Sequence, residues 1–183
     1  CFTWSEHDRR GRSNVVEFDP GGGFGTGAHP ATRLLLEELA ARLTGGERVL
    51  DVGCGSGVLA LCALGLGASS AVGVDIDARG IEATRRNAEL NGFEQRLEAT
   101  LAPLGEIEGA FDVVVANIGR AGLVELAPDL VARVSRGGWL AVSGISPSQC
   151  SSVADWLRPL QVLEHRRSDE WSALVLERRP PDT

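Results

Sequence analysis

The fold is decided by the stretch Val49-Leu-Asp-Val-Gly-Cys-Gly-Ser-Gly57. An apolar run here ends near a carboxylate, Asp51, and is followed by three alternate glycines, Gly53, Gly55 and Gly57. A second apolar run ends at another carboxylate, Asp75. This order predicts a strand, a tight glycine loop, a helix, a strand and an acid. α/β proteins bind nucleoside-bearing ligands with this arrangement, using loop backbone at one end and a carboxylate at the other.

The spacing of the glycines separates two classes of cofactor. A dinucleotide fingerprint has the pattern G-x-G-x-x-G, whose glycines let the backbone approach a pyrophosphate, but here the third glycine comes one residue early. Asp51 precedes the first glycine by two residues, where it would repel a phosphate and attract a cation. S-adenosylmethionine (SAM) carries an ammonium and a sulfonium and no phosphate, so we favour SAM. The alternatives are an NAD-dependent oxidoreductase and a turn that merely joins a strand to a helix.

Composition is that of one ordinary globular domain. A chain of 183 residues is long enough to bury a core, and its net charge of −7 argues against a broad nucleic-acid surface. We see no membrane-spanning run and no signal peptide. Metal-ligand spacing is absent from the four cysteines, so we expect no metal, reduced thiols and a cytoplasmic protein.

Helical and strand patterns alternate along the chain. They predict helices over residues 31–43, 56–66, 78–90, 123–134 and 148–157. They predict strands over residues 48–52, 71–74, 97–101, 111–116, 139–143, 161–166 and 171–177. A short polar link joins the last two strands as a hairpin, so one strand at that edge is antiparallel. The alternation is typical of an open, mostly parallel α/β sheet with helices on both faces, whose ligands lie beyond the carboxyl ends of the strands.

Polar residues fall at these predicted strand ends. Asp75 can accept both ribose hydroxyls, and we count its neighbour Ile76 among the cofactor-binding residues. Asp77 stands directly before a helix and is predicted to cap it. Asn117 can accept hydrogen bonds from an amine and can also donate. We therefore predict that Asn117 orients a nitrogen nucleophile or contacts the cofactor, the alternative being a turn-initiating Asn that bonds its own backbone.

A glycine-rich segment, residues 19–30, precedes the first predicted helix. Phe24 stands among its glycines, either as a lid that covers the cofactor and excludes water or as an anchor that packs the loop on the core. His29 is a candidate general base because imidazole titrates near neutral pH, and the alternative is a loop-ordering contact. Thr32 opens the helix, where its hydroxyl could cap the helix or reach a ligand carboxylate.

Several segments together carry a family resemblance. They are residues 19–33 and 49–57, Gly73-Val-Asp-Ile-Asp77, Asn87-Ala-Glu-Leu-Asn-Gly92, Val114-Val-Ala-Asn-Ile118, Ser143-Gly-Ile145 and Glu170-Trp171. From about residue 19 to residue 178 the chain resembles the PrmA family. These are class I SAM-dependent methyltransferases that modify amino groups of the eleventh large-subunit ribosomal protein.

The resemblance implies a seven-stranded, Rossmann-like sheet and contacts to SAM from the residues at matching motif positions, Thr32, Gly53, Asp75 and Asn117. The family has Met-Ala in place of Gly22-Gly23 and usually Leu in place of Gly119. Family members also carry an amino-terminal domain that grips the ribosomal protein. We expect an N-terminal segment (1–18), a methyltransferase domain (19–179) and a tail (180–183). Because the chain has no methionine, we also expect that residues precede Cys1.

The predicted reaction is in-line transfer of the SAM methyl group to a nitrogen acceptor. The protein mainly aligns the reactants and keeps water away, and the amine must arrive deprotonated because a protonated nitrogen has no lone pair. We expect a protein substrate, no direct nucleic-acid partner and no membrane. The alternatives are a methyltransferase for small molecules or peptides and a non-catalytic SAM-binding domain.

Overall fold

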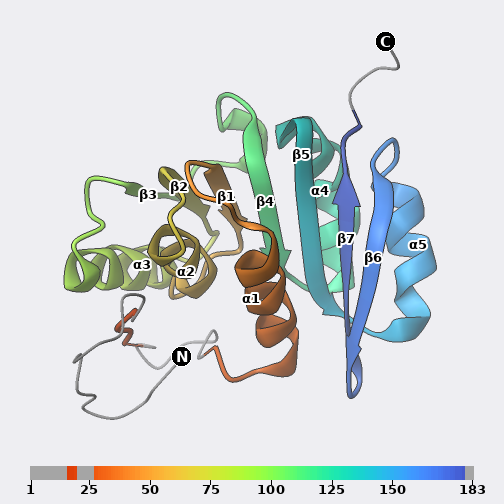
Figure 1. Ribbon diagram of the computed structural model, residues 1–183, viewed down its shortest axis with the longest axis horizontal. Helices are drawn as coiled ribbons and strands as arrows, with labels where there is room; N and C mark the ends of the chain where they lie inside the picture. Colours follow the sequence, from red (N-terminus) through yellow and green to blue (C-terminus); the bar gives the residue numbers. More distant parts are fainter. Residues whose placement is uncertain (1–15, 20–26, 180–183) are drawn as a thin grey trace.

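The structure is a computed structural model that describes residues 16–19 and 27–179. These residues form a seven-stranded sheet in the order β3-β2-β1-β4-β5-β7-β6 (Figure 1). The strands are β1 (Arg48–Val52), β2 (Ser70–Val74), β3 (Leu97–Thr100), β4 (Phe111–Asn117), β5 (Val134–Ile145), β6 (Gln161–Ser168) and β7 (Trp171–Glu177). β7 runs antiparallel to both of its neighbours, and every other pair is parallel. The predicted sheet and its antiparallel edge hairpin are confirmed.

Helices cover both faces of the sheet. They are α1 (Pro30–Arg42), α2 (Val58–Gly65), α3 (Ala78–Asn91), α4 (Arg120–Arg133) and α5 (Cys150–Trp156), with 3-10 turns at Leu104–Glu106 and Pro147–Gln149. Residues of α1 and α2 pack with Val113 and Val115 of β4 in one core cluster. Residues of α4 and α5 pack with Val114 and Ala116 in the other. Alternate residues of β4 thus enter opposite cores, which is why this strand is apolar from Val113 to Ala116.

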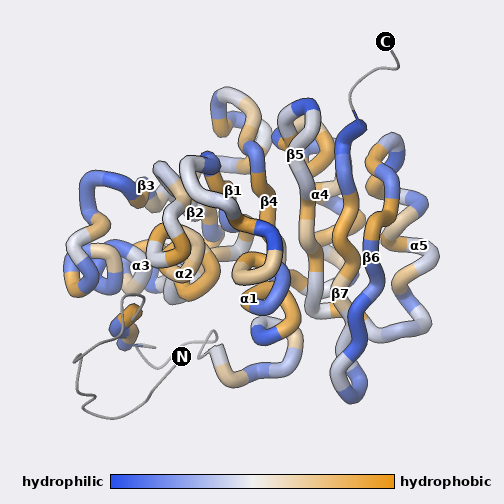
Figure 2. Tube along the Cα trace, in the orientation of Figure 1, coloured by the Kyte–Doolittle hydropathy of each residue, from blue (hydrophilic) through white to orange (hydrophobic). Residues whose placement is uncertain are grey.

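The hydropathy of the residues matches this layered arrangement. Figure 2 shows hydrophobic residues along the central strands and a largely hydrophilic β6 at the edge. In β6 the side chains alternate between exposed and half-buried positions along much of the strand. None of the helices in the described ranges is both long enough and apolar enough to cross a bilayer.

The largest differences from the predicted boundaries are at α4 and β5. The helix expected over residues 123–134 begins at Arg120, and β5 begins at Val134 rather than near residue 139. Gly137 and Gly138 were expected to end the helix, but they lie inside the strand. Gly137 has φ +77°, and a Cβ on Gly138 would lie 2.8 Å from the carbonyl oxygen of Asp112. Since the β4–β5 register shifts at this point, the two glycines mark an irregularity within the strand.

Candidate functional site

The glycine loop joins β1 to α2 at the carboxyl edge of the sheet. Gly53, Gly55 and Gly57 have φ values of +72°, +54° and +81°, which L residues rarely adopt. A Cβ on Gly53 would lie 2.5 Å from Cγ2 of Ile118, and one on Gly57 would lie 2.9 Å from the side chain of Thr84. The loop therefore needs glycine for its backbone conformation and, at Gly53 and Gly57, for close packing as well.

Asp51 points into the protein beneath this loop. It is 1% exposed, and its Oδ2 accepts a hydrogen bond from the amide of Ala60, at 3.2 Å. Within the described residues its Oδ1 has no hydrogen-bond partner. Burial, aided by the nearby carboxylate of Asp75, raises the pKa of Asp51 to about 7. A buried carboxylate oxygen without a partner is costly, so this atom fits a ligand that brings a positive charge or a donor.

Asp75 lies at the end of β2 and braces the loop. Its Oδ2 accepts from the amide of Gly55 at 2.8 Å, and its Oδ1 accepts from the amide of Asp77 at 2.9 Å. Each carboxylate oxygen can accept a further bond, so ribose hydroxyls can still be held here. The neighbouring Ile76 is 100% exposed, an apolar surface that a flat apolar ligand group would cover.

Asp77 has the predicted capping role. It is the N-cap of α3, and its side chain accepts from the amide of Arg79 at 2.9 Å. The Arg79 guanidinium also bonds this carboxylate, and together these contacts lower the pKa of Asp77. The prediction that Asp77 caps this helix is confirmed.

Asn117 and Thr32 meet across the sheet edge. Nδ2 of Asn117, the last residue of β4, donates to Oγ1 of Thr32 at 2.9 Å. Thr32 lies in the first turn of α1 and is 2% exposed. The structure thus brings together two residues that the sequence placed at the cofactor. The Asn117 amide group is directed toward Thr32, which differs from the turn-initiating alternative.

His29 has an ordering role. It is the N-cap of α1, and its Nδ1 accepts from the amide of Ala31 at 3.3 Å. Its ring meets that of Trp171 edge-on, with centroids 4.8 Å apart and an interplanar angle of 67°. When Nδ1 accepts, the proton of a neutral imidazole sits on Nε2, so this arrangement favours loop ordering over the general-base hypothesis. Phe24, the predicted lid or anchor, lies outside the described residues.

Two supporting residues were missed by the sequence reasoning. Thr84 is fully buried, donates to the carbonyl of Gly55 at 2.9 Å and lies 3.4 Å from Sγ of Cys54. Asn87 is 1% exposed and donates to the carbonyl of Ser56 at 3.0 Å. Both support the glycine loop from α3. The sequence feature that could have located them is a polar side chain beside the apolar positions of an amphipathic helix.

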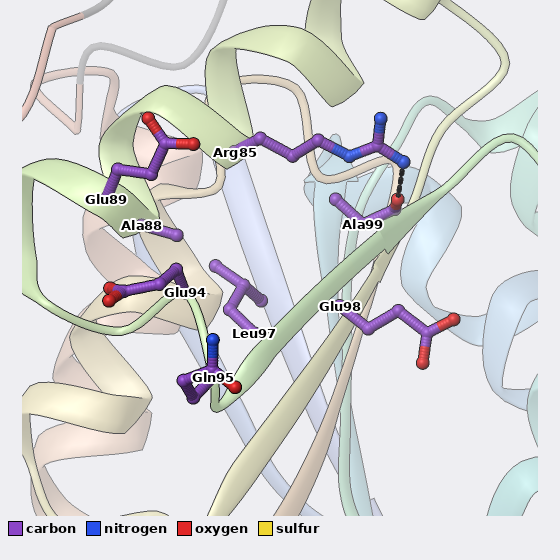
Figure 3. A pocket seen from close by; sticks show the side chains of 8 residues that line it. All are labelled: Arg85, Ala88, Glu89, Glu94, Gln95, Leu97, Glu98 and Ala99. Carbon is purple, nitrogen blue, oxygen red and sulfur yellow. Dashed lines mark hydrogen bonds between the residues drawn. The ribbon is translucent and has the colours of Figure 1, made fainter.

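A separate surface pocket of about 400 Å³ lies between α3 and β3 (Figure 3). It is lined by Arg85, Ala88, Glu89, Glu94, Gln95, Leu97, Glu98 and Ala99. The Arg85 guanidinium donates to the carbonyl of Ala99 at 2.6 Å. No predicted site residue lines this pocket. The candidate site is therefore a different place, the carboxyl edge of the sheet with the glycine loop, Asp75 and Asn117. Nowhere in residues 16–19 and 27–179 do three metal-ligating side chains gather.

Comparisons with known proteins find similar sequences over nearly the whole chain. A family model described as ribosomal protein L11 methyltransferase (PrmA) matches residues 1–179. A protein of that name from Geobacter sp. (strain M21) is 43% identical over 178 residues, which are 94% of this chain and 58% of the relative. Another from Geobacter metallireducens is 45% identical over 177 residues, 96% of this chain and 58% of the relative. The chain thus spans somewhat over half the length of these curated relatives.

Solved structures show the same fold. The crystal structure of a ribosomal protein L11 methylase from Lactobacillus delbrueckii subsp. bulgaricus superposes with a TM-score of 0.81 and 31% identity, over 90% of this chain and 84% of that one. A T. Thermophilus 16S rRNA methyltransferase, solved in complex with AdoMet and guanosine, has a TM-score of 0.67 and 27% identity, over 82% of this chain and 43% of that one.

Proposed function

Because the chain belongs to the family of ribosomal protein L11 methyltransferases (PrmA), we propose that it is a SAM-dependent methyltransferase that modifies amino groups of a protein. The observation that carries this proposal is Asp51. Its buried Oδ1 lacks a hydrogen-bond partner within the described residues, beside a loop in which Gly53 is exposed and Gly55 is half-buried. A cationic methyl donor satisfies that oxygen, whereas a dinucleotide would bring phosphates toward a carboxylate.

Different residues of the site bind different parts of SAM, the methyl donor. Asp51 attracts the ammonium, and the backbone of Gly53, Gly55 and Gly57 accommodates the amino-acid part. Asp75 accepts the ribose hydroxyls while it keeps its bonds to Gly55 and Asp77. Ile76 covers the adenine base of SAM with an apolar surface. Bound SAM supplies an electrophilic methyl group on a sulfonium, so little activation by the protein is needed.

Asn117 handles the acceptor. With Nδ2 held by Thr32, its Oδ1, which has no hydrogen-bond partner among residues 16–19 and 27–179, accepts a hydrogen bond from an incoming amine and orients the nitrogen lone pair. Alignment of this kind accounts for a large part of the rate of a bimolecular reaction. His29 orders the start of α1, and the amine loses its proton to solvent before it enters.

The acceptor follows from the family. The relatives are named for methylation of ribosomal protein L11, and we propose the same substrate for this chain, with the cytoplasm as its location. Residues 19–179 are the catalytic domain in this proposal, residues 1–18 an N-terminal segment and residues 180–183 a tail. The acidic balance of the chain favours a protein acceptor over a nucleic acid.

Calorimetry tests whether the chain binds SAM, the proposed methyl donor. SAM should give a clear binding isotherm, and NAD should give none. Asp75→Asn removes an acceptor of ribose hydroxyls and should weaken SAM binding by roughly 1–3 kcal/mol. Asp77→Asn is the matched control, because it loses the same charge two residues away and keeps a good N-cap. No heat with SAM but clear binding of NAD would overturn the proposal. Transfer of a labelled methyl group to ribosomal protein L11 tests the acceptor.

A further inference from the structure

Two asparagines of α3 hold a segment that is distant in sequence. Oδ1 of Asn91 accepts from the amide of Glu17 at 2.8 Å, and its Nδ2 donates to the Glu17 carbonyl at 2.6 Å. Asn87 repeats this pattern with Asp19, at 2.9 Å for both bonds. Each side-chain amide therefore pairs with the N–H and the C=O of a single residue, as a neighbouring β-strand would.

The spacing of the two amides matches the spacing of the chain they bind. Residues four apart on an α-helix are separated by about 6 Å along the axis. Alternate residues of an extended chain are about 6.6 Å apart. Asn87 and Asn91 are four apart, and Glu17 and Asp19 are alternate residues, so α3 presents a two-step side-chain ladder for residues 16–19. This gives a physical reason for the N-x-x-x-N pattern in the segment Asn87–Gly92.

The two apolar residues of this segment secure it from another side. Val16 and Phe18 pack against the core cluster that contains α1 and α2. Gly65 of α2 makes room for this contact, because a Cβ there would lie 2.9 Å from Cγ2 of Val16. Gly65 is not in a left-handed conformation, so packing is the reason for glycine at this position. Residues 16–19 are thus fixed by backbone bonds to α3 and by apolar contacts to the core.

The ladder also reaches the cofactor loop. Nδ2 of Asn87 donates both to the carbonyl of Asp19 and to the carbonyl of Ser56, which lies between Gly55 and Gly57. Nδ2 of Asn91 instead donates its second bond to the carbonyl of Asn87 within the helix. One asparagine therefore joins residues 16–19 to the glycine loop, and the other holds only residues 16–19.

We propose that Asn87 and Asn91 are positioning residues that register residues 16–19 on α3 and, through the Asn87–Ser56 contact, set the glycine loop for SAM. The coupling to SAM rests on the proposed function. Asn87 fixes the loop and the segment together, so its loss affects the ligand more than the loss of Asn91 does. A merely structural role would lower stability in both variants without changing affinity for SAM in the folded protein.

The experiment compares Asn87→Ala, Asn91→Ala and, as a control, Glu82→Ala at an exposed position of the same helix. Amide hydrogen exchange without ligand should speed up at Asp19 in Asn87→Ala and at Glu17 in Asn91→Ala, each at least 10-fold. The dissociation constant for SAM, measured where each variant is fully folded, should rise at least 10-fold in Asn87→Ala and about 3-fold in Asn91→Ala. Glu82→Ala should change neither quantity.

The outcomes separate the two proposals. A folded Asn87→Ala protein that binds SAM as tightly as wild type overturns the inference and leaves the proposed function standing. If Asn87→Ala does not fold, Asn91→Ala decides: unchanged exchange at Glu17 or unchanged SAM affinity overturns the inference. A wild-type chain that does not bind SAM overturns the proposed function and the coupling with it, while the exchange pattern still tests the ladder.

Discussion

Asp51 and Glu38 are both carboxylates that are 1% exposed, yet their surroundings are opposite. Glu38 lies on α1, where Arg42 Nε is 2.7 Å from its Oε2 and Arg166 Nε is 3.1 Å from its Oε1. The second contact has ion-pair distance without hydrogen-bond geometry. Among the described residues, Asp51 has a single amide donor and no cationic partner. One buried acid thus has cationic partners within the fold, whereas the other has a single amide donor.

The Glu38 cluster closes an edge of the molecule. Arg42 and Arg166 also pair with Glu164 of β6, and Arg166 lies 3.7 Å from Glu37. These contacts tie α1 to the edge strand, which has little apolar surface of its own to bury. A buried charge that has cationic partners within the chain, as Glu38 has, serves structure. One that lacks a partner at the ligand edge of an α/β sheet points to a function.

The largest expected effect is a pH dependence of stability caused by Asp51. Burial raises its pKa from the ordinary value of 3.8 to about 7, so between these values the folded chain holds a proton that the unfolded chain has lost. The contribution of Asp51 to the free energy of unfolding is then highest below pH 4 and falls as pH rises to about 7. Between pH 5 and pH 7 the wild type should lose about 2–3 kcal/mol more than Asp51→Asn.

Urea unfolding of both proteins without ligand, from pH 5 to pH 8, measures this difference. Parallel stability curves for the wild type and the Asn variant would show that Asp51 does not titrate in this range. Glu38→Gln serves as the comparison for loss of a buried charge that already has its partners.

The affinity for SAM should rise with pH, whereas the stability contributed by Asp51 falls. The ionised Asp51 attracts the ammonium of SAM, so affinity should rise from pH 6 to pH 7.5 in the wild type. Asp51→Asn should weaken binding at pH 7.5 by about 2 kcal/mol, near 30-fold, and should remove the pH dependence. Calorimetry at several pH values tests both statements. Equal affinities in the two proteins would show that the unpartnered oxygen is not the ammonium site.

Glu38→Gln should lower the stability of the fold and leave the affinity for SAM nearly unchanged. Removing the charge leaves Arg42 and Arg166 without their buried partner, and the free energy of unfolding should fall by about 1–2 kcal/mol. SAM affinity should stay within a factor of two, because Glu38 belongs to the α1–β6 contact. Thermal unfolding and calorimetry on the same preparation measure the two quantities. A large loss of SAM affinity without loss of stability would contradict the separation of the two regions.

Local sequence signals located the strands and the glycine loop because these depend on short-range pattern. Asp51 was placed at the cofactor from its distance to Gly53 alone, but its missing partner depends on how α2 packs over β1. The Glu38 cluster could not be predicted, because Arg166 is distant in sequence and only the antiparallel hairpin brings it near α1. Likewise, Gly137 and Gly138 are typical helix-ending residues, and only their backbone hydrogen bonds to Arg178, directly after β7, make them part of a strand.

The smallest expected effect falls on the residue that connects the two regions. Thr32 and Glu38 lie on the same helix, and Thr32 holds the amide of Asn117. Thr32→Val removes that acceptor while preserving shape, so the free energy of unfolding should fall by about 1 kcal/mol. Thr32→Ser keeps the hydroxyl and should restore the position of Asn117. Rates of methyl transfer to ribosomal protein L11 should therefore drop about 5-fold in the Val variant and recover in the Ser variant. Equal rates in all three proteins would mean that Asn117 is oriented by its strand alone, whereas a loss in both variants would place the cause in the packing of the missing or added methyl groups.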